Sequence, residues 1–277
     1  MSRAELIVHD LGGDGQAILY AHATGFHARC WQPVAAALPQ FRNIAYDARG
    51  HGDTPAPPNW RVDWATYGVD AATVAAELGP EMGADGPIVG VGHSMGGAAL
   101  LMAAIAHPRL FRALVVYEPI VMPPIQPGAQ ELPDGGNVLA IGARRRRSSF
   151  DSFEAAIANF SAKPPMNIFT PEAIDSYVRG GFTLGTDGKV HLKCRPEHEA
   201  RTYEAGGLHR TWDHLGEIEI PVWVVCGQPE PLQPSRFMHE LSQQLPNGRY
   251  IQHNHLGHFG PLQAPAELAG LVASVAS

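Results

Sequence analysis

Cysteine is scarce in this sequence, which holds only Cys30, Cys194 and Cys226 among its 277 residues. An odd number of cysteines without a short repeated spacing suggests neither a disulfide framework nor a zinc site. Long apolar runs are also missing, since no window approaches the roughly 18 uninterrupted apolar residues of a membrane span. The first residues contain no apolar core of a signal peptide. We therefore expect a cytoplasmic protein that does not cross a membrane.

Basic residues are fewer than acidic ones, with 20 Lys and Arg against 27 Asp and Glu and a formal net charge of −7. Because a negatively charged protein repels phosphate backbones, nucleic acid is not an expected partner. The hydrophobic fraction of 45% and the charged fraction of 17% are ordinary for a globular protein. Composition therefore predicts a folded domain with enough apolar material for a core.

Short apolar runs alternate with helical stretches along most of the chain, which predicts a mostly parallel sheet covered by helices. The expected strands are 17–21, 43–47, 87–91, 113–117, 221–226 and 249–253, with one or two antiparallel edge strands before residue 17. The expected helices between and after them are 31–38, 64–78, 97–107, 235–245 and 264–275.

Residues 121–211 interrupt this alternation, because they contain no clear sheet strand. The stretch opens with a loop rich in proline and glycine at 122–128, and helical patches follow at 138–148, 152–160, 171–180 and 196–205. An insertion of this kind predicts a helical lid. We therefore assign residues 1–120 and 212–277 to an α/β core and residues 121–211 to the lid.

One short motif supplies a candidate nucleophile. Residues 92–97 read G-H-S-M-G-G, which fits the pattern G-x-S-x-G, and they lie where an expected strand ends and a helix begins. A serine on such a tight turn has a strained backbone, so its neighbours must lack side chains. We expect Ser94 to be the nucleophile. The amide of Met95, at the start of the helix, is the expected first donor of an oxyanion hole.

On this motif and its setting the chain resembles the α/β-hydrolase family, in particular its members with a lid, and the resemblance covers nearly the whole chain. Residues 22–25 (H-A-T-G) are similar to the family's His-Gly oxyanion loop, with Ala23 in place of the second glycine. Residues 47–52 (D-A-R-G-H-G) are similar to its D-x-R-G-x-G turn, which we interpret as structural. The resemblance implies a mostly parallel, eight-stranded-type sheet with helices on both faces. It also implies that the amide of Thr24 is the second oxyanion donor.

A serine nucleophile needs a general base, and histidine has a pKa suited to this role. Of the fourteen histidines, His258 is the candidate, because residues 256–261 (L-G-H-F-G-P) follow the last expected strand and resemble the family's G-H motif. His253 and His255 form an H-x-H-x2-H string with it that could hold a metal. No supporting carboxylate cluster follows, so we expect neither a metal nor another cofactor.

Two glutamates compete for the third position of a catalytic triad. Glu230 follows the fifth expected strand and aligns with the family's G-x-x-D-P loop, with glutamate in place of aspartate. Glu118 ends the strand after the nucleophile helix, where some relatives place their acid. The prolines on both sides of Glu230 would stiffen its loop. We favour Glu230 by a narrow margin and keep Glu118 as the alternative.

Neighbours of these groups are the expected lining of a substrate pocket: His22, Gly25, Phe26, His93 and Phe259. The four arginines at 144–147 form a separate charge run. Four consecutive helical residues cover most of a helix circumference, so they cannot all face one ligand. We expect most of them to be solvated and to pair with acids such as Asp151 and Glu154, while one or two could reach an anionic group of a substrate.

The sequence thus predicts a serine hydrolase that acts on a small to medium, partly apolar ester or lactone through an acyl-enzyme. The expected partner is a small-molecule substrate. The same residues would also suit carbon–carbon bond hydrolysis, perhydrolysis, lyase chemistry or cofactor-free oxygenation, because fold does not decide function. A ligand-binding protein without activity on the same scaffold is the third alternative.

Overall fold

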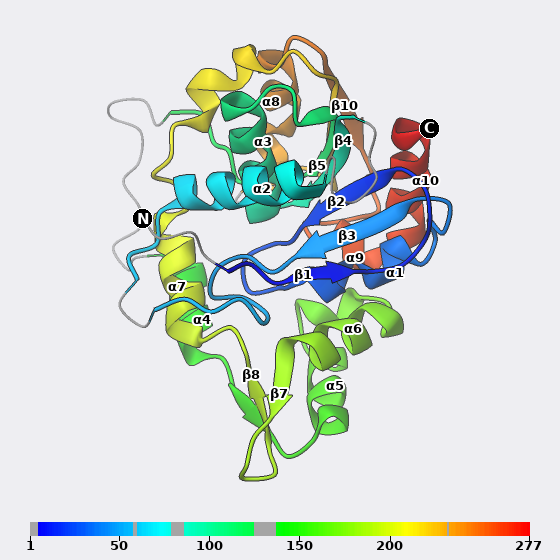
Figure 1. Ribbon diagram of the computed structural model, residues 1–277. Helices are drawn as coiled ribbons and strands as arrows, with labels where there is room; N and C mark the ends of the chain where they lie inside the picture. The colour runs from blue at the N-terminus through cyan, green and yellow to red at the C-terminus, as the bar shows by residue number, and fades with distance from the viewer. Residues whose placement is uncertain (1–4, 58–59, 79–85, 125–136, 232) are drawn as a thin grey trace.

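The computed structural model describes residues 5–57, 60–78, 86–124, 137–231 and 233–277. A seven-stranded sheet forms its centre (Figure 1). Its strands are β1 (Val8–Asp10), β2 (Ala17–Ala21), β3 (Arg42–Tyr46), β4 (Ile88–His93), β5 (Phe111–Tyr117), β9 (Val222–Cys226) and β10 (Gly248–Gln252). They lie in the order β1-β3-β2-β4-β5-β9-β10, and only β1 runs antiparallel to its neighbour. The predicted, mostly parallel sheet is confirmed, with seven strands instead of eight in the described residues.

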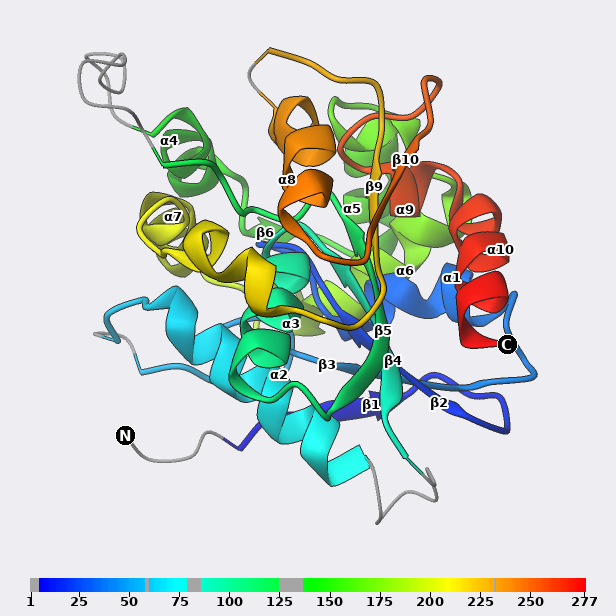
Figure 2. The same ribbon diagram turned by 90° about the horizontal axis from the view of Figure 1, so that it is seen from above.

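Helices cover both faces of this sheet, as Figures 1 and 2 show. One face carries α2 (Trp64–Leu78), α3 (Met95–Ala106), η3 (Thr211–Glu217) and α8 (Met238–Gln244). The other carries η1 (Ala28–Trp31), α1 (Gln32–Ala35) and α10 (Pro265–Ala276). Neighbouring residues of a strand alternate between the two apolar cores: Leu19 belongs to the first and Ile18 to the second. Both faces are therefore buried, which explains the continuous apolar runs in the sequence.

The 121–211 insertion contains the four expected helices, α4 (Val138–Arg145), α5 (Phe153–Ser161), α6 (Pro171–Gly181) and α7 (Pro196–Ala205). The short helix η2 (Met166–Ile168) lies between α5 and α6, and η4 (Pro234–Phe237) precedes α8 in the core. Asn137, Ser152 and Thr170 cap α4, α5 and α6 by accepting the amide N–H three residues further on. Part of the expected loop at 122–128 lies outside the described residues.

The expectation that the insertion holds no sheet strand is wrong. Three short strands, β6 (Ser149–Phe150), β7 (Phe182–Leu184) and β8 (Val190–Leu192), form an antiparallel sheet in the order β6-β8-β7. Strands β7 and β8 form a hairpin, and its turn contains Asp187 and Gly188, whose φ is +77°. An Asp-Gly pair between two short apolar segments is a hairpin signal that the sequence did contain.

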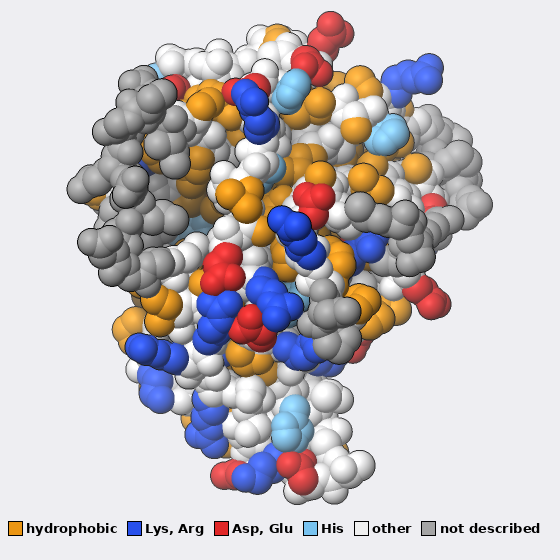
Figure 3. Space-filling model, turned by 90° about the vertical axis from the view of Figure 1, so that its left-hand side faces the viewer, with side chains coloured by type: hydrophobic (Ala, Val, Ile, Leu, Met, Phe, Trp, Pro, Cys, Tyr) orange, Lys and Arg blue, Asp and Glu red, His pale blue; other side chains and the backbone are white. Residues whose placement is uncertain are grey.

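The insertion packs on the core at several places, two of which lie near the carboxyl ends of the strands. Helix α6 packs on η1, directly after β2, and the ring of His198 in α7 lies over the backbone of Gly50, after β3. Helices α4 and α7 pack together, and acidic and basic side chains are intermingled on the face that carries them (Figure 3). There Arg144 pairs with Glu197 and Glu204, not with the acids that the sequence suggested.

The three cysteines are buried free thiols, in agreement with the expectation that they form no disulfide framework. Burial raises the pKa of the Cys226 thiol to about 11, so this thiol stays protonated at neutral pH. None of the helices in the described part of the chain has both the length and the apolar character needed to span a membrane.

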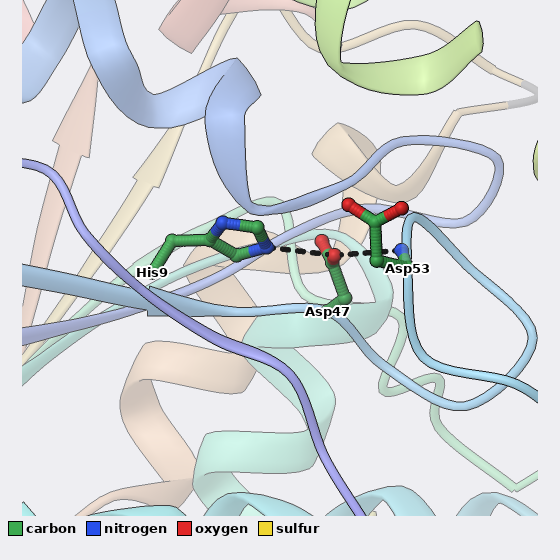
Figure 4. A group of neighbouring side chains, drawn as sticks. All are labelled: His9, Asp47 and Asp53. Carbon is green, nitrogen blue, oxygen red and sulfur yellow. Dashed lines mark hydrogen bonds and ion pairs between the residues drawn. The ribbon is translucent and has the colours of Figure 1, made fainter. Parts of the chain in front are cut away.

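Asp47 joins three segments at the end of β3 (Figure 4). Its carboxylate accepts the amide N–H of Ala28 at 2.8 Å, the amide N–H of Asp53 at 2.9 Å and Nε2–H of His9 at 2.8 Å. Gly52 has a φ of +51°, and a Cβ there would lie 2.2 Å from the Asp47 carboxyl carbon. Burial alone would raise the pKa of Asp47, but hydrogen bonds from His9 and the two amides hold it well below its usual value. The turn at 47–52 is therefore built around this carboxylate, in line with its structural interpretation.

Replacing Asp47 with Ala should lower the free energy of unfolding by about 3 kcal/mol, because one buried and two partly buried donors lose a charged acceptor. Asp53→Ala is the matched control, since it keeps its backbone N–H and loses only the exposed pair with Lys193. Urea unfolding of the control should change by less than about 0.5 kcal/mol. Equal effects of the two substitutions would contradict this account.

Candidate active site

The predicted nucleophile lies on a sharp turn between β4 and α3. Ser94 has φ 55° and ψ −115°, a strained conformation for a residue with a side chain, and it is buried. A Cβ on Gly96 would lie 2.2 Å from the carbonyl oxygen of Ala21, and one on Gly92 would lie 2.6 Å from Cα of Gly97. Only glycine therefore fits at positions 92 and 96, and the strand–turn–helix setting predicted for the serine is confirmed.

Among the described residues other than glycine, only Ser94 and Glu118 have a positive φ, which is 42° for Glu118. The two strained residues lie on adjacent strand ends, and the amide of Ser94 donates to the carbonyl oxygen of Tyr117 at 3.0 Å. Strain of this kind persists only where the surrounding structure holds it, and it concentrates at functional sites. Its coincidence at these two residues marks the ends of β4 and β5 as the candidate site.

Glu118 is fully buried, and both of its carboxylate oxygens have donors. Nδ1–H of His258 donates to Oε2 at 2.7 Å, and the amide of Gly227 donates to Oε1 at 2.9 Å. His258 keeps a partly exposed ring. A carboxylate on Nδ1 fixes the tautomer that leaves Nε2 free to act as a base.

The preference for Glu230 over Glu118 as the partner of His258 is contradicted by this geometry. Glu230 is exposed, and its amide N–H donates to Oγ of Ser235. Strand β5 lies between β4 and β9 in the sheet, so Glu118 leaves a strand adjacent to that of Ser94. The loop after β9 contributes the Gly227 amide to Glu118 and not a carboxylate of its own.

Three side chains hold the loop that carries His258. The hydroxyl of Tyr117 donates to the carbonyl oxygen of Gly257 at 2.8 Å, and Nε2–H of His93 donates to that of His258 at 2.8 Å. His93, an expected pocket residue, is buried and thus holds the loop. Tyr117 and Gln263, which accepts the Gly257 amide at 3.0 Å, were missed because no motif marks them. The helix α9 (Gly260–Gln263) follows this loop.

The segment after β2 has its own internal support. Nδ1–H of His22 donates to the carbonyl oxygen of Ala23 at 2.8 Å, and Nε2 of the same ring accepts the amide N–H of Ala48 at 2.9 Å. Both ring nitrogens of His22 are thus engaged, so this expected pocket residue holds the loop instead of offering a polar group to a ligand. In the described part of the chain, the amides of Thr24 and Met95 donate to no protein acceptor.

Aromatic side chains form one wall beside these groups. The ring of Phe26 lies 5.9 Å from Phe259, 6.2 Å from Phe169 and 5.2 Å from Tyr177, measured between ring centres. Phe26 and Phe259 were expected in the pocket, whereas Phe169 and Tyr177 come from the insertion. The wall therefore combines core and insertion residues in one largely buried apolar cluster next to the ring of His258, which is 5.2 Å from Phe259.

Several histidines around the site are buried without a charge partner. Burial lowers the pKa of His27 to about 4, and it also lowers the pKa values of His22, His51, His93 and His198. The rings of His22 and His51 lie 5.3 Å apart, and those of His51 and His198 lie 5.4 Å apart. These tilted and edge-on ring contacts connect the loop at residues 22–25 to α7 of the insertion.

The three histidines of the H-x-H-x2-H string contact different carboxylates. His253 and His255 share Glu267, whereas His258 contacts Glu118. Among the described residues, the only group of three candidate ligand atoms within 4.8 Å of one another is His9, Asp47 and Asp53 (Figure 4). The Asp47 oxygens in that group already accept three hydrogen bonds, and Asp53 pairs with Lys193.

Comparison with known proteins bears on the family and the fold. Residues 18–271 match the model of the alpha/beta hydrolase family. The chain is 37% identical over 118 residues to Lipase LipV of Mycobacterium tuberculosis, a match that spans 42% of each protein. It is 26% identical over 243 residues to the non-heme chloroperoxidase CPO-A1 of Kitasatospora aureofaciens, over 84% of this chain and 81% of that protein. The solved structure of E-2-(acetamidomethylene)succinate hydrolase superposes with a TM-score of 0.77 at 20% identity, over 97% and 94% of the two chains, and so shares the fold.

Glu118→Gln should lower kcat by about two to four orders of magnitude, because an amide no longer sets the imidazole tautomer or stabilises its charge. Glu230→Gln is the matched control and should change kcat by less than about twofold, as an exposed loop substitution. Steady-state kinetics on a chromogenic ester measure both. A large loss in Glu230→Gln with normal turnover in Glu118→Gln would restore the original preference.

The buried histidines should make the protein less stable in mild acid. Their folded pKa values lie below the unfolded value, so their contribution is complete above about pH 6.5 and is lost as the pH falls, by about 1.4 kcal/mol per pH unit for each neutral ring. Urea unfolding between pH 7.5 and 5 measures this slope. His27→Gln should reduce this slope by about 1.4 kcal/mol per pH unit, which corresponds to one proton fewer taken up on unfolding. A stability that stays constant or increases toward pH 5 would contradict the burial argument.

Proposed function

Because the chain belongs to the alpha/beta hydrolase family and is a hydrolase, we propose that it cleaves a small to medium, partly apolar ester or lactone with Ser94, His258 and Glu118. The observation that carries the proposal is the 2.7 Å hydrogen bond between His258 and the buried Glu118, next to the strained turn of Ser94. The serine follows β4, the acid follows the adjacent strand β5, and the histidine lies in the loop after β10.

In the proposed mechanism, Nε2 of His258 removes the proton from Ser94 Oγ while this oxygen attacks the acyl carbon. Glu118 stabilises the imidazolium that forms. The unpartnered amides of Thr24 and Met95 hold the oxyanion, and the N-terminus of α3 adds its dipole. His258 then protonates the leaving alcohol. Water, activated by the same histidine, releases the acid and restores Ser94.

The aromatic wall supports a substrate with an apolar part. The ring of Phe259 lies next to that of His258, and the rings of Phe26 and Phe169 follow it in the same cluster. Burying apolar surface of a substrate against these rings would stabilise binding by about 25 cal/mol per Å². The insertion supplies Phe169 and therefore acts as the lid of the proposed pocket. Three buried free thiols support the cytoplasm as the place of action.

Perhydrolysis is the second candidate activity, because the chain is similar to a chloroperoxidase over most of its length. In that reaction hydrogen peroxide, in place of water, attacks the acyl-enzyme. The products are a peracid and the free hydroxyl of Ser94. Adding peroxide to a turnover assay should divert acyl groups to peracid if this activity operates. Unchanged acid release, with no peracid detected by iodide oxidation, would exclude it.

Ser94→Ala should abolish p-nitrophenyl acetate turnover, by about three orders of magnitude or more, and should prevent labelling by a fluorophosphonate probe. The buried serine contributes little to packing, so the melting temperature should stay near that of the wild type. Ser274→Ala, on exposed helix surface, is the control and should keep both activity and labelling. Undiminished turnover in a folded Ser94→Ala protein would refute the proposal, and a wild-type protein without turnover or labelling would indicate a ligand-binding role.

A further inference from the structure

Three helices of the insertion meet at one buried ion pair. Arg146 directly follows α4, Glu199 lies in α7 and Tyr177 lies in α6. The guanidinium of Arg146 donates to Oε2 of Glu199 and to the hydroxyl of Tyr177. The side chains of Glu199 and Arg146 are 7% and 19% exposed, and Tyr177 is fully buried. One arginine of the 144–147 run is thus withdrawn from solvent, whereas Arg144 remains in an exposed pair.

This ion pair lies directly against the oxyanion loop. Gly25 has a φ of +79°, and a Cβ at this residue would lie 2.5 Å from Oε1 of Glu199 and 3.4 Å from Nη1 of Arg146. The carboxylate therefore contacts the backbone of the residue that follows Thr24, the second proposed oxyanion donor. The absence of a side chain at Gly25 permits this close approach.

A second connection joins helix α6 to the same loop. Nε2–H of His27 donates to the carbonyl oxygen of Tyr177 at 2.9 Å, and the rings of Phe26 and Tyr177 lie 5.2 Å apart. A Cβ at Gly180 would lie 2.4 Å from the His27 ring, so α6 and the loop are in direct contact. Tyr177 thus holds residues 26 and 27 from one side, while the Arg146–Glu199 pair holds Gly25 from the other.

We propose that Arg146 and Glu199 are positioning residues that hold the Gly25 turn, and through it the Thr24 amide, in the orientation that binds the oxyanion. The inference rests on the proposed function. Neither residue touches the reacting atoms. Taking two charges out of water is expensive, and a buried pair often gains little stability over apolar residues of similar volume. The ion pair instead serves to orient the Thr24 amide, because a small displacement of an oxyanion donor strongly lowers the rate.

The competing interpretation is a subsite for an anionic substrate group. Glu199 already neutralises Arg146, and Tyr177 takes a further N–H of the guanidinium. An incoming carboxylate would have to displace Glu199 or approach its negative charge. The geometry therefore favours a role in positioning.

The test compares Arg146→Met, Glu199→Gln and the control Arg144→Met, which removes two exposed ion pairs from the last turn of α4. Each variant is measured for kcat and KM on neutral and carboxylate-bearing esters, and for inhibition by phenylboronic acid. Boron adds to Ser94 Oγ as the proton passes to His258, and the tetrahedral adduct occupies the oxyanion hole. Melting curves identify the folded variants.

The two site variants should lose about 10- to 100-fold in kcat, with KM within about twofold, and boronate inhibition should weaken by a similar factor. Arg146→Lys should recover part of the loss, because it keeps the charge. The control should stay within about twofold in every measure. If Arg146→Met does not fold, Arg146→Lys and Tyr177→Phe replace it in the test. Each should lose about 3- to 10-fold in kcat and in boronate inhibition.

Two results would overturn the inference while the proposed function stands. One is a folded Arg146→Met with normal kcat and normal boronate inhibition. The other is a rise in KM confined to carboxylate-bearing esters, which would identify an anion subsite. If Ser94→Ala kept the turnover and the boronate binding of the wild type, the proposed function itself would be refuted, and the inference with it.

Discussion

A carboxylate that is completely removed from water must find donors for both oxygens, and this requirement at Glu118 determines how the site is assembled. An isolated buried charge is so costly that it would be neutralised or expelled. Glu118 receives one amide N–H from the loop after β9 and one imidazole N–H from the loop after β10. The carboxylate therefore joins three segments that are far apart in the sequence, and His258 is oriented as a consequence of satisfying it.

The rest of the site follows from close approaches between backbones. Ser94 has its strained conformation because glycines allow α3 to start against the carbonyl of Ala21. His22 fixes the loop at residues 22–25 through both ring nitrogens, and Tyr117 and His93 hold the loop of His258. The insertion contributes to the same frame, since its residues touch the oxyanion loop at Gly25 and His27. The amide of Thr170 also donates to the carbonyl of Leu262 in α9, just beyond the His258 loop.

Periodicity and motifs predicted most of the sheet, because a strand buried on both faces reads as a short apolar run between helical stretches. The turn of Ser94 was predictable because the close backbone contacts of such a turn require glycines, and the sequence shows them. The choice of acid was not, since Glu118 and Glu230 both follow strands that end on the same sheet edge. What separates them is the fully buried position of Glu118 and its distance to His258, which depend on tertiary packing.

The hairpin of the insertion and the role of Arg146 show two further limits of local pattern. Strands β7 and β8 have only three residues each, so their alternation is too short to detect, although the Asp187-Gly188 turn gave a signal. The four arginines look alike in the sequence, and only packing distinguishes the exposed Arg144 from the buried Arg146. Likewise, His22 and His93 are expected to line the pocket because they are close to Thr24 and Ser94 in the sequence. Their ring nitrogens instead form hydrogen bonds that hold loops.

The central claim is that Ser94, His258 and Glu118 form one catalytic unit with the amides of Thr24 and Met95. The most direct test is a crystal structure of the protein treated with phenylboronic acid. The account predicts boron bonded to Ser94 Oγ, one boronate oxygen about 3 Å from both amides, and His258 still bonded to Glu118. Boron bonded elsewhere, or an imidazole turned to Glu230, would contradict it.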